Sequence, residues 1–144
     1  MSPSNAVELL LVEDNPQDLE LAVRALRKAN LSNHIQIARD GAEALEYVFC
    51  EGPFAARKIE DGPKVILLDL KLPIKSGFDV LQWLRQTPGL AALRVVVVSG
   101  SELETDLARA RSLGVIDYLV KPTSPARLAQ LVSERHARWL GLGE

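Results

Sequence analysis

Two adjacent acidic residues, Glu13 and Asp14, follow directly on the apolar run "VELLLV" at residues 7–12. Ionised carboxylates at the end of a buried segment repel each other and resist loss of hydration, so placing them there costs free energy. An acid pair in this position can serve simply to cap the following helix. If the pair instead does chemistry, it predicts a positive charge close by.

Three other apolar runs also lead into polar or charged residues. "KVILLD" (64–69) ends in Asp69, "RVVVVSG" (94–100) contains Ser99, and "DYLV" (117–120) is followed by Lys121. In an open parallel α/β sheet, ligands bind outside the carboxyl ends of the strands. If these runs are strands of such a sheet, their terminal residues share one edge with the acid pair and form a candidate site.

The composition of the four runs supports their assignment as strands. Their Val, Ile and Leu residues show no alternation with polar residues, which is typical of strands covered on both faces. A fifth segment, "HIQIAR" (34–39), alternates apolar and polar residues and is predicted to be an edge strand.

Helical patterns separate the strands. The first helix, over 15–30, has an apolar stripe and begins with the N-cap signal Asn15-Pro16. The start signals of the other four are Asp40 with Glu43 (a helix to about Phe49), Gly77, a Ser101–Glu104 capping box (ending at Gly114), and Ser124-Pro125 (running toward Trp139). The order βαβαβαβαβα predicts an α/β fold with a mainly parallel sheet and helices on both faces.

The bulk properties exclude several classes of protein. With 144 residues, we expect a single domain over residues 1–144 and no output domain. The net charge of -2 offers no broad basic face for nucleic acid. The single Cys50 excludes an internal disulfide and is expected to pack as a small apolar group; no run of about 20 apolar residues indicates a membrane span. A cytoplasmic protein without nucleic-acid or membrane partners is expected.

The long segment 50–63, with two Gly-Pro pairs, is either a functional surface loop or an extended helix end, and a tolerated surface insertion is favoured. His34 and His136 have no metal-ligand spacing and are expected on the surface. The apolar end at Trp139 and Leu140 either closes the core or serves a dimer contact, and we favour the dimer contact.

Four phrases, "LLVEDN", "ILLDLKLPIKSGFDVL", "VVVVSGSE" and "DYLVKP", together resemble the receiver domain of two-component response regulators over nearly the whole chain. The resemblance implies a doubly wound, flavodoxin-like five-stranded parallel sheet in the order 2-1-3-4-5. The long loop and the "DLKLP" phrase resemble, more narrowly, the small regulators that partner cyanobacterial and bacterial phytochromes.

This strand order gives the acids a role. The strands that end at Asp14 and Asp69 become neighbours about 5 Å apart, so both carboxylates can reach one Mg²⁺ ion. Glu13 is expected to bind through a metal-bound water, and the resemblance adds the backbone carbonyl of Lys71 as a ligand. Asp69 is then the phosphoryl acceptor from a sensor histidine kinase, plausibly a phytochrome, in a signalling domain that is not a turnover enzyme.

The remaining site residues follow from the strand positions and the resemblance. Ser99, on the adjacent strand, can hydrogen-bond a phosphoryl oxygen, whereas Lys121 lies about two strand spacings away and needs its long side chain to reach it. The resemblance makes Tyr118 the switch aromatic and leaves access open at Gly100. The signalling surface, and a homodimer contact, are expected on helix 4, strand 5 and helix 5.

Small departures from the family pattern are Glu13 in place of the usual Asp and Ser99 in place of the commoner Thr. Lys71 and Ser101 flank the access to the phosphoryl group and could set its lifetime. Two other functions stay open: a receiver-shaped scaffold that binds partners without being phosphorylated, and a phosphatase of the haloacid dehalogenase type. The phosphatase needs a second Asp two positions after the nucleophile, where this chain has Lys71.

Overall fold

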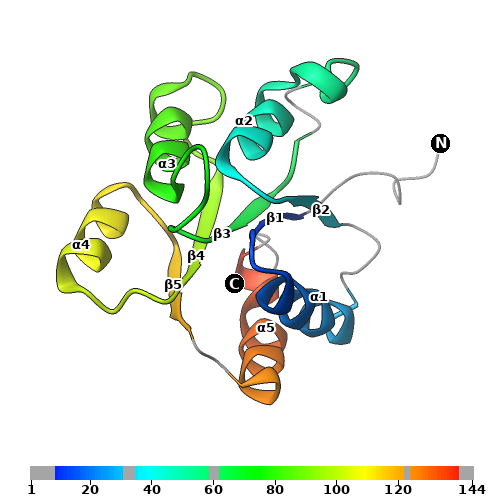
Figure 1. Ribbon diagram of the computed structural model, residues 1–144, viewed down its shortest axis with the longest axis vertical. Coiled ribbons are helices and arrows are strands. Elements are labelled where there is room, and N and C mark those ends of the chain that lie inside the picture. The colour runs from blue at the N-terminus through cyan, green and yellow to red at the C-terminus, as the bar shows by residue number, and fades with distance from the viewer. Residues whose placement is uncertain (1–8, 31–34, 59–61, 122–123, 140–144) are drawn as a thin grey trace.

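A computed structural model describes residues 9–30, 35–58, 62–121 and 124–139. Strands and helices alternate along the chain (Figure 1). The elements are β1 (Leu9–Val12), α1 (Pro16–Lys28), β2 (Ile35–Ala38), α2 (Gly41–Phe49), the 3-10 turn η3 (Gly52–Phe54), β3 (Val65–Leu68), α3 (Gly77–Gln86), β4 (Arg94–Ser99), α4 (Glu104–Ser112), β5 (Asp117–Val120) and α5 (Pro125–Trp139).

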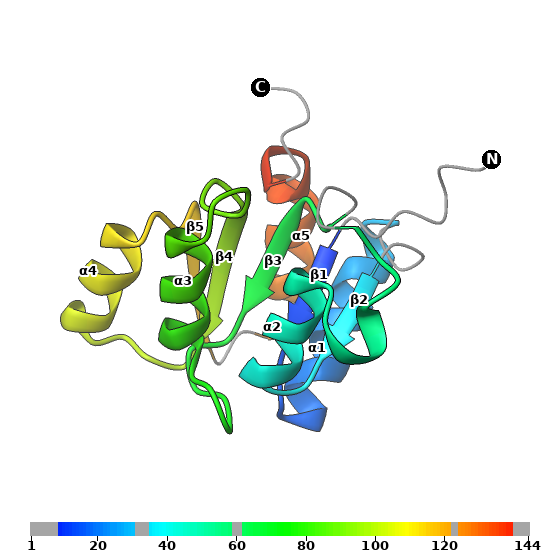
Figure 2. The same ribbon diagram turned by 90° about the horizontal axis from the view of Figure 1, so that it is seen from above.

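The five strands form one parallel sheet in the order β2-β1-β3-β4-β5. This confirms the predicted α/β fold, its strand order and the edge position of the alternating segment, which is β2. Helices α1 and α5 cover one face of the sheet, and α2, α3 and α4 lie on the other (Figures 1 and 2). The sheet is therefore the middle layer of three, and its central strands are shielded on both sides.

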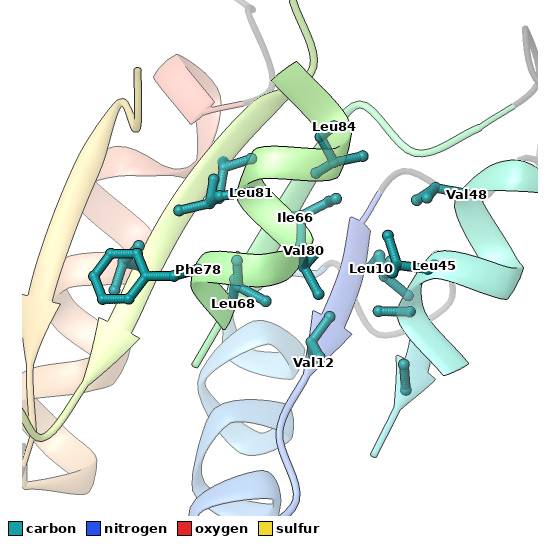
Figure 3. Close-up of a cluster of buried hydrophobic side chains, with 14 of the residues drawn as sticks. Leu10, Val12, Leu45, Val48, Ile66, Leu68, Phe78, Val80, Leu81 and Leu84 are labelled. Carbon is teal, nitrogen blue, oxygen red and sulfur yellow. The ribbon is translucent and has the colours of Figure 1, made fainter. Parts of the chain in front are cut away.

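Two hydrophobic clusters hold these layers together. Leu10, Val12, Ile66 and Leu68 of β1 and β3 face α2 and α3, as the close-up of this cluster shows (Figure 3). Their alternate neighbours in the strands, such as Leu11, join α1 and α5 in the second cluster. Because consecutive strand residues point to opposite faces, both sets must be apolar. This is why the runs show no polar alternation.

Most helix starts are where the sequence predicts them. The Asn15 side chain accepts hydrogen bonds from the N–H groups of Gln17 and Asp18, and Asp40 accepts one from the N–H of Glu43. Helix α3 begins at Gly77 and has a capping box between Ser76 and Asp79, which the sequence analysis did not identify.

The predicted capping box at Ser101 is wrong. Helix α4 begins at Glu104, and its N-cap residue Leu103 makes no side-chain capping bond. The Ser101 hydroxyl instead donates to Asp106 (2.5 Å) and accepts from the N–H of Leu103 (3.3 Å). Ser101 lies two residues before the N-cap position, and its hydroxyl ties the loop before α4 to the first turn of that helix.

The long segment after α2 folds back onto that helix. Cys50 ends α2 with a left-handed backbone (φ 57°), so the segment is not an extension of the helix. Phe54 packs edge-on against Tyr47, with ring centroids 4.9 Å apart, and the guanidinium of Arg57 lies 3.8 Å from the centre of the same ring. The described part of the loop is thus a small aromatic and cationic cap on the end of α2.

The preference for a dimer contact at Trp139 is wrong. The indole ring is fully buried within the protein, and its N–H donates to the carboxylate of Asp117 (3.1 Å), which also accepts from Arg135. Trp139 therefore closes the core between α5 and β5. The predictions for His34, Leu140 and the side chain of His136 lie outside the described residues. In the part of the chain described, every helix is too short or too polar to cross a membrane.

Candidate functional site

The backbone places the candidate residues one step beyond the strand ends. The N–H of Glu13 donates to Ala38 of β2 (3.0 Å), and that of Asp69 donates to Val12 of β1 (3.1 Å). The N–H of Lys121 donates to Ser99 of β4 (2.7 Å). These bonds continue the parallel ladders past the last regular pair, so each functional residue is held by the sheet although its side chain leaves it.

Three carboxylates converge at this edge. Glu13, Asp14 and Asp69 each offer an oxygen, and these oxygens all lie within 4.8 Å of one another. Glu13 and Asp69 are almost buried, at 4% and 7% exposure, whereas Asp14 is exposed. Backbone N–H groups orient the two buried acids: that of Asn15 donates to Glu13, and that of Lys71 donates to Asp69, both at 3.1 Å.

The positive charge that the acid pair predicts is Lys121. Its ammonium lies 2.6 Å from Glu13, 3.0 Å from Asp18 and 3.1 Å from Asp69. The sequence analysis missed Asp18, which stands one helical turn after Asp14. Asp14 precedes the N-cap Asn15 and Asp18 lies in the first turn of α1, so the presence of a further acid just after the helix start is the signal in the sequence that could have indicated Asp18.

Burial and hydrogen bonding shift the pKa values of Glu13 and Lys121. Between the sheet, α1 and α5 lies a mainly apolar cavity of about 90 Å³, and Glu13 is one of the residues that line it. Desolvation raises the pKa of Glu13 to about 7, against the lowering effect of Lys121 and of the Asn15 N–H. Burial opposes the charge of Lys121 most strongly, but hydrogen bonds to Glu13 and Asp18 outweigh it and raise its pKa.

The donor set suits a hard divalent cation. Mg²⁺ prefers carboxylate and carbonyl oxygens and keeps several waters, and the three converging carboxylates provide oxygens of this kind. The exposure of Asp14 leaves room for water on the outer side. Lys121 already compensates two of these carboxylates, so a cation and the ammonium compete for the same oxygens.

The loop between β3 and α3 is closed at its base. The N–H of Gly77 donates to Leu70 (2.9 Å), and a Cβ at residue 77 would lie 2.3 Å from the carbonyl oxygen of Asp69. Only glycine permits this approach. Within the loop, Ile74 has a positive φ of 70° and is 76% exposed, while the N–H of Lys75 donates across it to Pro73 (2.7 Å). A β-branched residue is strained in this conformation.

The loop after β4 connects the site to β5. Ser99 is fully buried, and its hydroxyl accepts from the N–H of Ser101 (3.2 Å). The hydroxyl of Tyr118 donates to the carbonyl of Ser101 (2.9 Å), so the ring lies against this loop. Burial raises the pKa of the Tyr118 hydroxyl. A Cβ at Gly100 would meet nothing within 4 Å, so the space beside this residue is open.

Helix α4 is held mainly by contacts near its ends. It buries only Ala110. Arg85 of α3 donates to the carbonyls of Leu113 (2.6 Å) and Gly114 (3.3 Å) after α4, and to those of Ala91 (3.0 Å) and Leu93 (2.8 Å) before β4. The sequence analysis did not identify Arg85.

Fold, strand order and site together define a receiver-type α/β domain. The chain matches the family model of the response regulator receiver domain over residues 9–133 and belongs to that family. A relative named "Probable methanogenesis regulatory protein FilR2", from Methanothrix harundinacea, is 39% identical over 134 residues, covering 92% of this chain and 83% of the relative. The response regulator Rcp1 of Synechocystis sp. is 33% identical over 132 residues, covering 92% and 88%.

Solved structures agree with this assignment. The phosphorylated cyanobacterial phytochrome response regulator RcpA superposes with a TM-score of 0.84 at 35% identity, covering 96% of both chains. The Mn²⁺-bound form of Rcp1 superposes with a TM-score of 0.82 at 32% identity, covering 96% of this chain and 97% of Rcp1. RcpA, one of these relatives, is a phytochrome response regulator, which agrees with the resemblance noted in the sequence.

Proposed function

We propose that this protein is a stand-alone response regulator, with residues 1–144 forming a single receiver domain, that accepts a phosphoryl group on Asp69 from a histidine kinase. The observation that carries the proposal is the convergence, at one sheet edge, of Glu13, Asp14 and Asp69 with the ammonium of Lys121. Its relatives RcpA and Rcp1, described as phosphorylated and Mn²⁺-bound, support the same chemistry here. The phytochrome connection of these relatives makes a phytochrome the proposed kinase.

In the proposed reaction, a carboxylate oxygen of Asp69 attacks the phosphorus of a phosphohistidine. The new O–P bond forms as the N–P bond breaks, and the electron pair returns to the imidazole, which takes up a proton from solvent. When bound by Glu13, Asp14, Asp69 and the Lys71 carbonyl, Mg²⁺ supplies neutralisation of phosphoryl charge. Lys121 contributes a second positive charge, and Ser99 contributes its O–H as a donor, since its contact with the N–H of Ser101 uses the hydroxyl oxygen only as an acceptor.

The output is proposed to be a change in protein binding at the surface formed by α4, β5 and α5, including a homodimer contact. The added phosphoryl group carries about -1.5 to -2 charges and three acceptor oxygens. Drawing Ser99 and Lys121 toward these oxygens would alter the loop that Tyr118 contacts. Because Tyr118 belongs to β5, the change at the acid site reaches this surface directly.

The test is phosphorylation of the purified protein by acetyl phosphate or a candidate phytochrome kinase in Mg²⁺. The wild-type protein is expected to gain one hydroxylamine-sensitive phosphate, seen by intact mass, and to change its apparent size. Asp69→Asn should gain none, while Glu102→Gln, an exposed charge change, should behave as wild type. Equal labelling of Asp69→Asn would overturn the proposal. Absence of labelling in the wild-type protein would favour the unphosphorylated scaffold.

A further inference from the structure

The ammonium of Lys121 has three carboxylate partners, and only two of them also belong to the candidate metal site. Glu13 and Asp69 belong to the group of converging oxygens, whereas Asp18 does not. An ammonium has three N–H donors, so these partners use its full capacity. The side chain of Asp18 is also more exposed, at 37%, than those of Glu13 (6%) and Asp69 (8%).

Under the proposed function, two of these partners become engaged elsewhere. Glu13 and Asp69 are among the oxygens that hold the divalent cation, and Asp69 also carries the phosphoryl group. Lys121 would then lose two of its three hydrogen bonds. Its side chain has four rotatable bonds, and fixing such a chain costs roughly 1.5 to 2 kcal/mol of conformational entropy. Of the three carboxylates, Asp18 is the one that remains as a partner, and it holds the ammonium in place beside the phosphoryl oxygens.

The position of Asp18 is well defined by the local structure. Asn15 caps the helix by accepting from the backbone N–H groups of residues 17 and 18, and Pro16 fixes the first turn. The capping is thus complete without the Asp18 carboxylate. A carboxylate in the first turn is favoured by the helix dipole alone, but that role does not require it to contact an ammonium 103 residues away at 3.0 Å.

We propose that Asp18 is a positioning residue, which holds the ammonium of Lys121 at the acid site while the other two carboxylates are engaged with the cation and the phosphoryl group. The proposal rests on the proposed function of the site. It assigns to the first turn of α1 a part in retaining the phosphoryl group, although no atom of that turn needs to touch it.

The test uses beryllofluoride as the phosphoryl mimic at saturating Mg²⁺, with occupancy measured by fluorine NMR. Asp18→Asn should weaken its apparent affinity roughly 3- to 10-fold, because a partly exposed charge-assisted hydrogen bond to Lys121 is lost. A pure charge effect has the opposite sign, since removing a negative charge favours an anion. Asp18→Glu should restore the affinity. Glu20→Gln, the same charge change at an exposed position of α1, should have no effect.

In a Lys121→Met background, Asp18→Asn should cause no loss of affinity, because the residue through which it acts is gone. Unchanged or tighter binding by Asp18→Asn, or an equal loss in the Lys121→Met background, would overturn the proposal. Failure of the wild-type protein to take beryllofluoride would instead count against the proposed function.

A second measurement distinguishes failure of this proposal from failure of the proposed function, since it needs no phosphoryl group. The coupling between Asp18→Asn and Lys121→Met in unfolding free energy should persist when Mg²⁺ saturates the protein. A coupling that vanishes in Mg²⁺ would show that Asp18 does not hold Lys121 once the cation is bound, and would overturn the proposal whatever the phosphoryl chemistry.

Discussion

Replacement of Lys121 by Met tests the electrostatic balance of the site most directly. The substitution keeps the length and apolar stem of the side chain and removes the charge that lies between Glu13, Asp18 and Asp69. We expect the variant to be less stable than the wild type without divalent cation, and expect Mg²⁺ to reduce this difference.

The magnitude follows from burial. Leaving one partner of a buried ion pair uncompensated costs about 3 to 5 kcal/mol. The Lys121 side chain is 17% exposed, and that of Asp18, one of its three partners, is 37% exposed, so the expected loss is at the lower end of this range, about 3 kcal/mol. The measurement belongs well above pH 7, because the pKa of Glu13 is about 7 with Lys121 in place and rises further without it, and proton uptake by Glu13 would conceal the loss.

A divalent cation supplies the missing charge. Binding to the folded state at about 100 times the dissociation constant adds about 2.7 kcal/mol of stability. The variant should gain more than the wild type because no ammonium competes for the carboxylates. In urea unfolding followed by circular dichroism, the deficit of Lys121→Met should therefore fall by at least half between EDTA and saturating Mg²⁺.

The control is Lys64→Met, an exposed charge at the opposite end of the sheet, beside the first residue of β3. It should change stability by less than about 0.5 kcal/mol in either condition. An identical deficit for Lys121→Met in EDTA and in Mg²⁺ would refute the argument that the ammonium and the cation serve the same carboxylates.

Three further predictions concern pH, packing and strain. Because Glu13 must lose its proton to bind a cation, Mg²⁺ affinity measured by calorimetry should fall by up to about tenfold per pH unit below 7 and level off above it. Glu13→Gln should abolish this pH dependence. A pH dependence that persists in Glu13→Gln would show that another group takes up the proton. Arg85→Met should lower the unfolding free energy by about 2 to 4 kcal/mol, since four carbonyls lose a charged donor. Arg85→Lys should recover less than half of the lost stability, and full recovery would contradict the role of the planar guanidinium. Ile74→Asn should raise the unfolding free energy by about 1 kcal/mol by relieving the positive φ, whereas the β-branched control Ile74→Thr should not; equal effects would show that strain is absent.

The strands were predictable because burial on both faces leaves a strong compositional signal. The runs beginning at Arg94 and Asp117 match β4 and β5 within one residue. Helix starts were predictable where a polar side chain caps its own helix, as at Asn15 and Asp40. Ser101 shows the limit of this reasoning, because its hydroxyl has several donors and acceptors within reach and the spacing to Glu104 cannot decide among them.

The convergence of the acids was predictable once the strand order was known from the family resemblance. The contacts that involve helix faces were not. Asp18 meets Lys121 only because the Lys121 side chain reaches from the end of β5 to the first turn of α1, and the rotation of α1 is set by its packing. Trp139 was misjudged for a similar reason: its apolar face is visible in the sequence, but the buried carboxylate of Asp117 that satisfies its N–H is not.

The tight approach of Gly77 to the backbone of Asp69 has a consequence for how this protein can vary. The Gly77–Leu70 hydrogen bond closes the base of this loop, and residues 72–75 lie between Lys71, which orients Asp69, and Ser76, which caps α3. Insertions or deletions within residues 72–75 would change what projects beside Asp69, the proposed phosphoryl acceptor, while leaving Asp69 in place. A single methyl group at residue 77 would instead push directly on the peptide of Asp69. Positions that tolerate change and a position that does not are therefore neighbours in this loop, and new side chains can be added here without moving the carboxylate of Asp69.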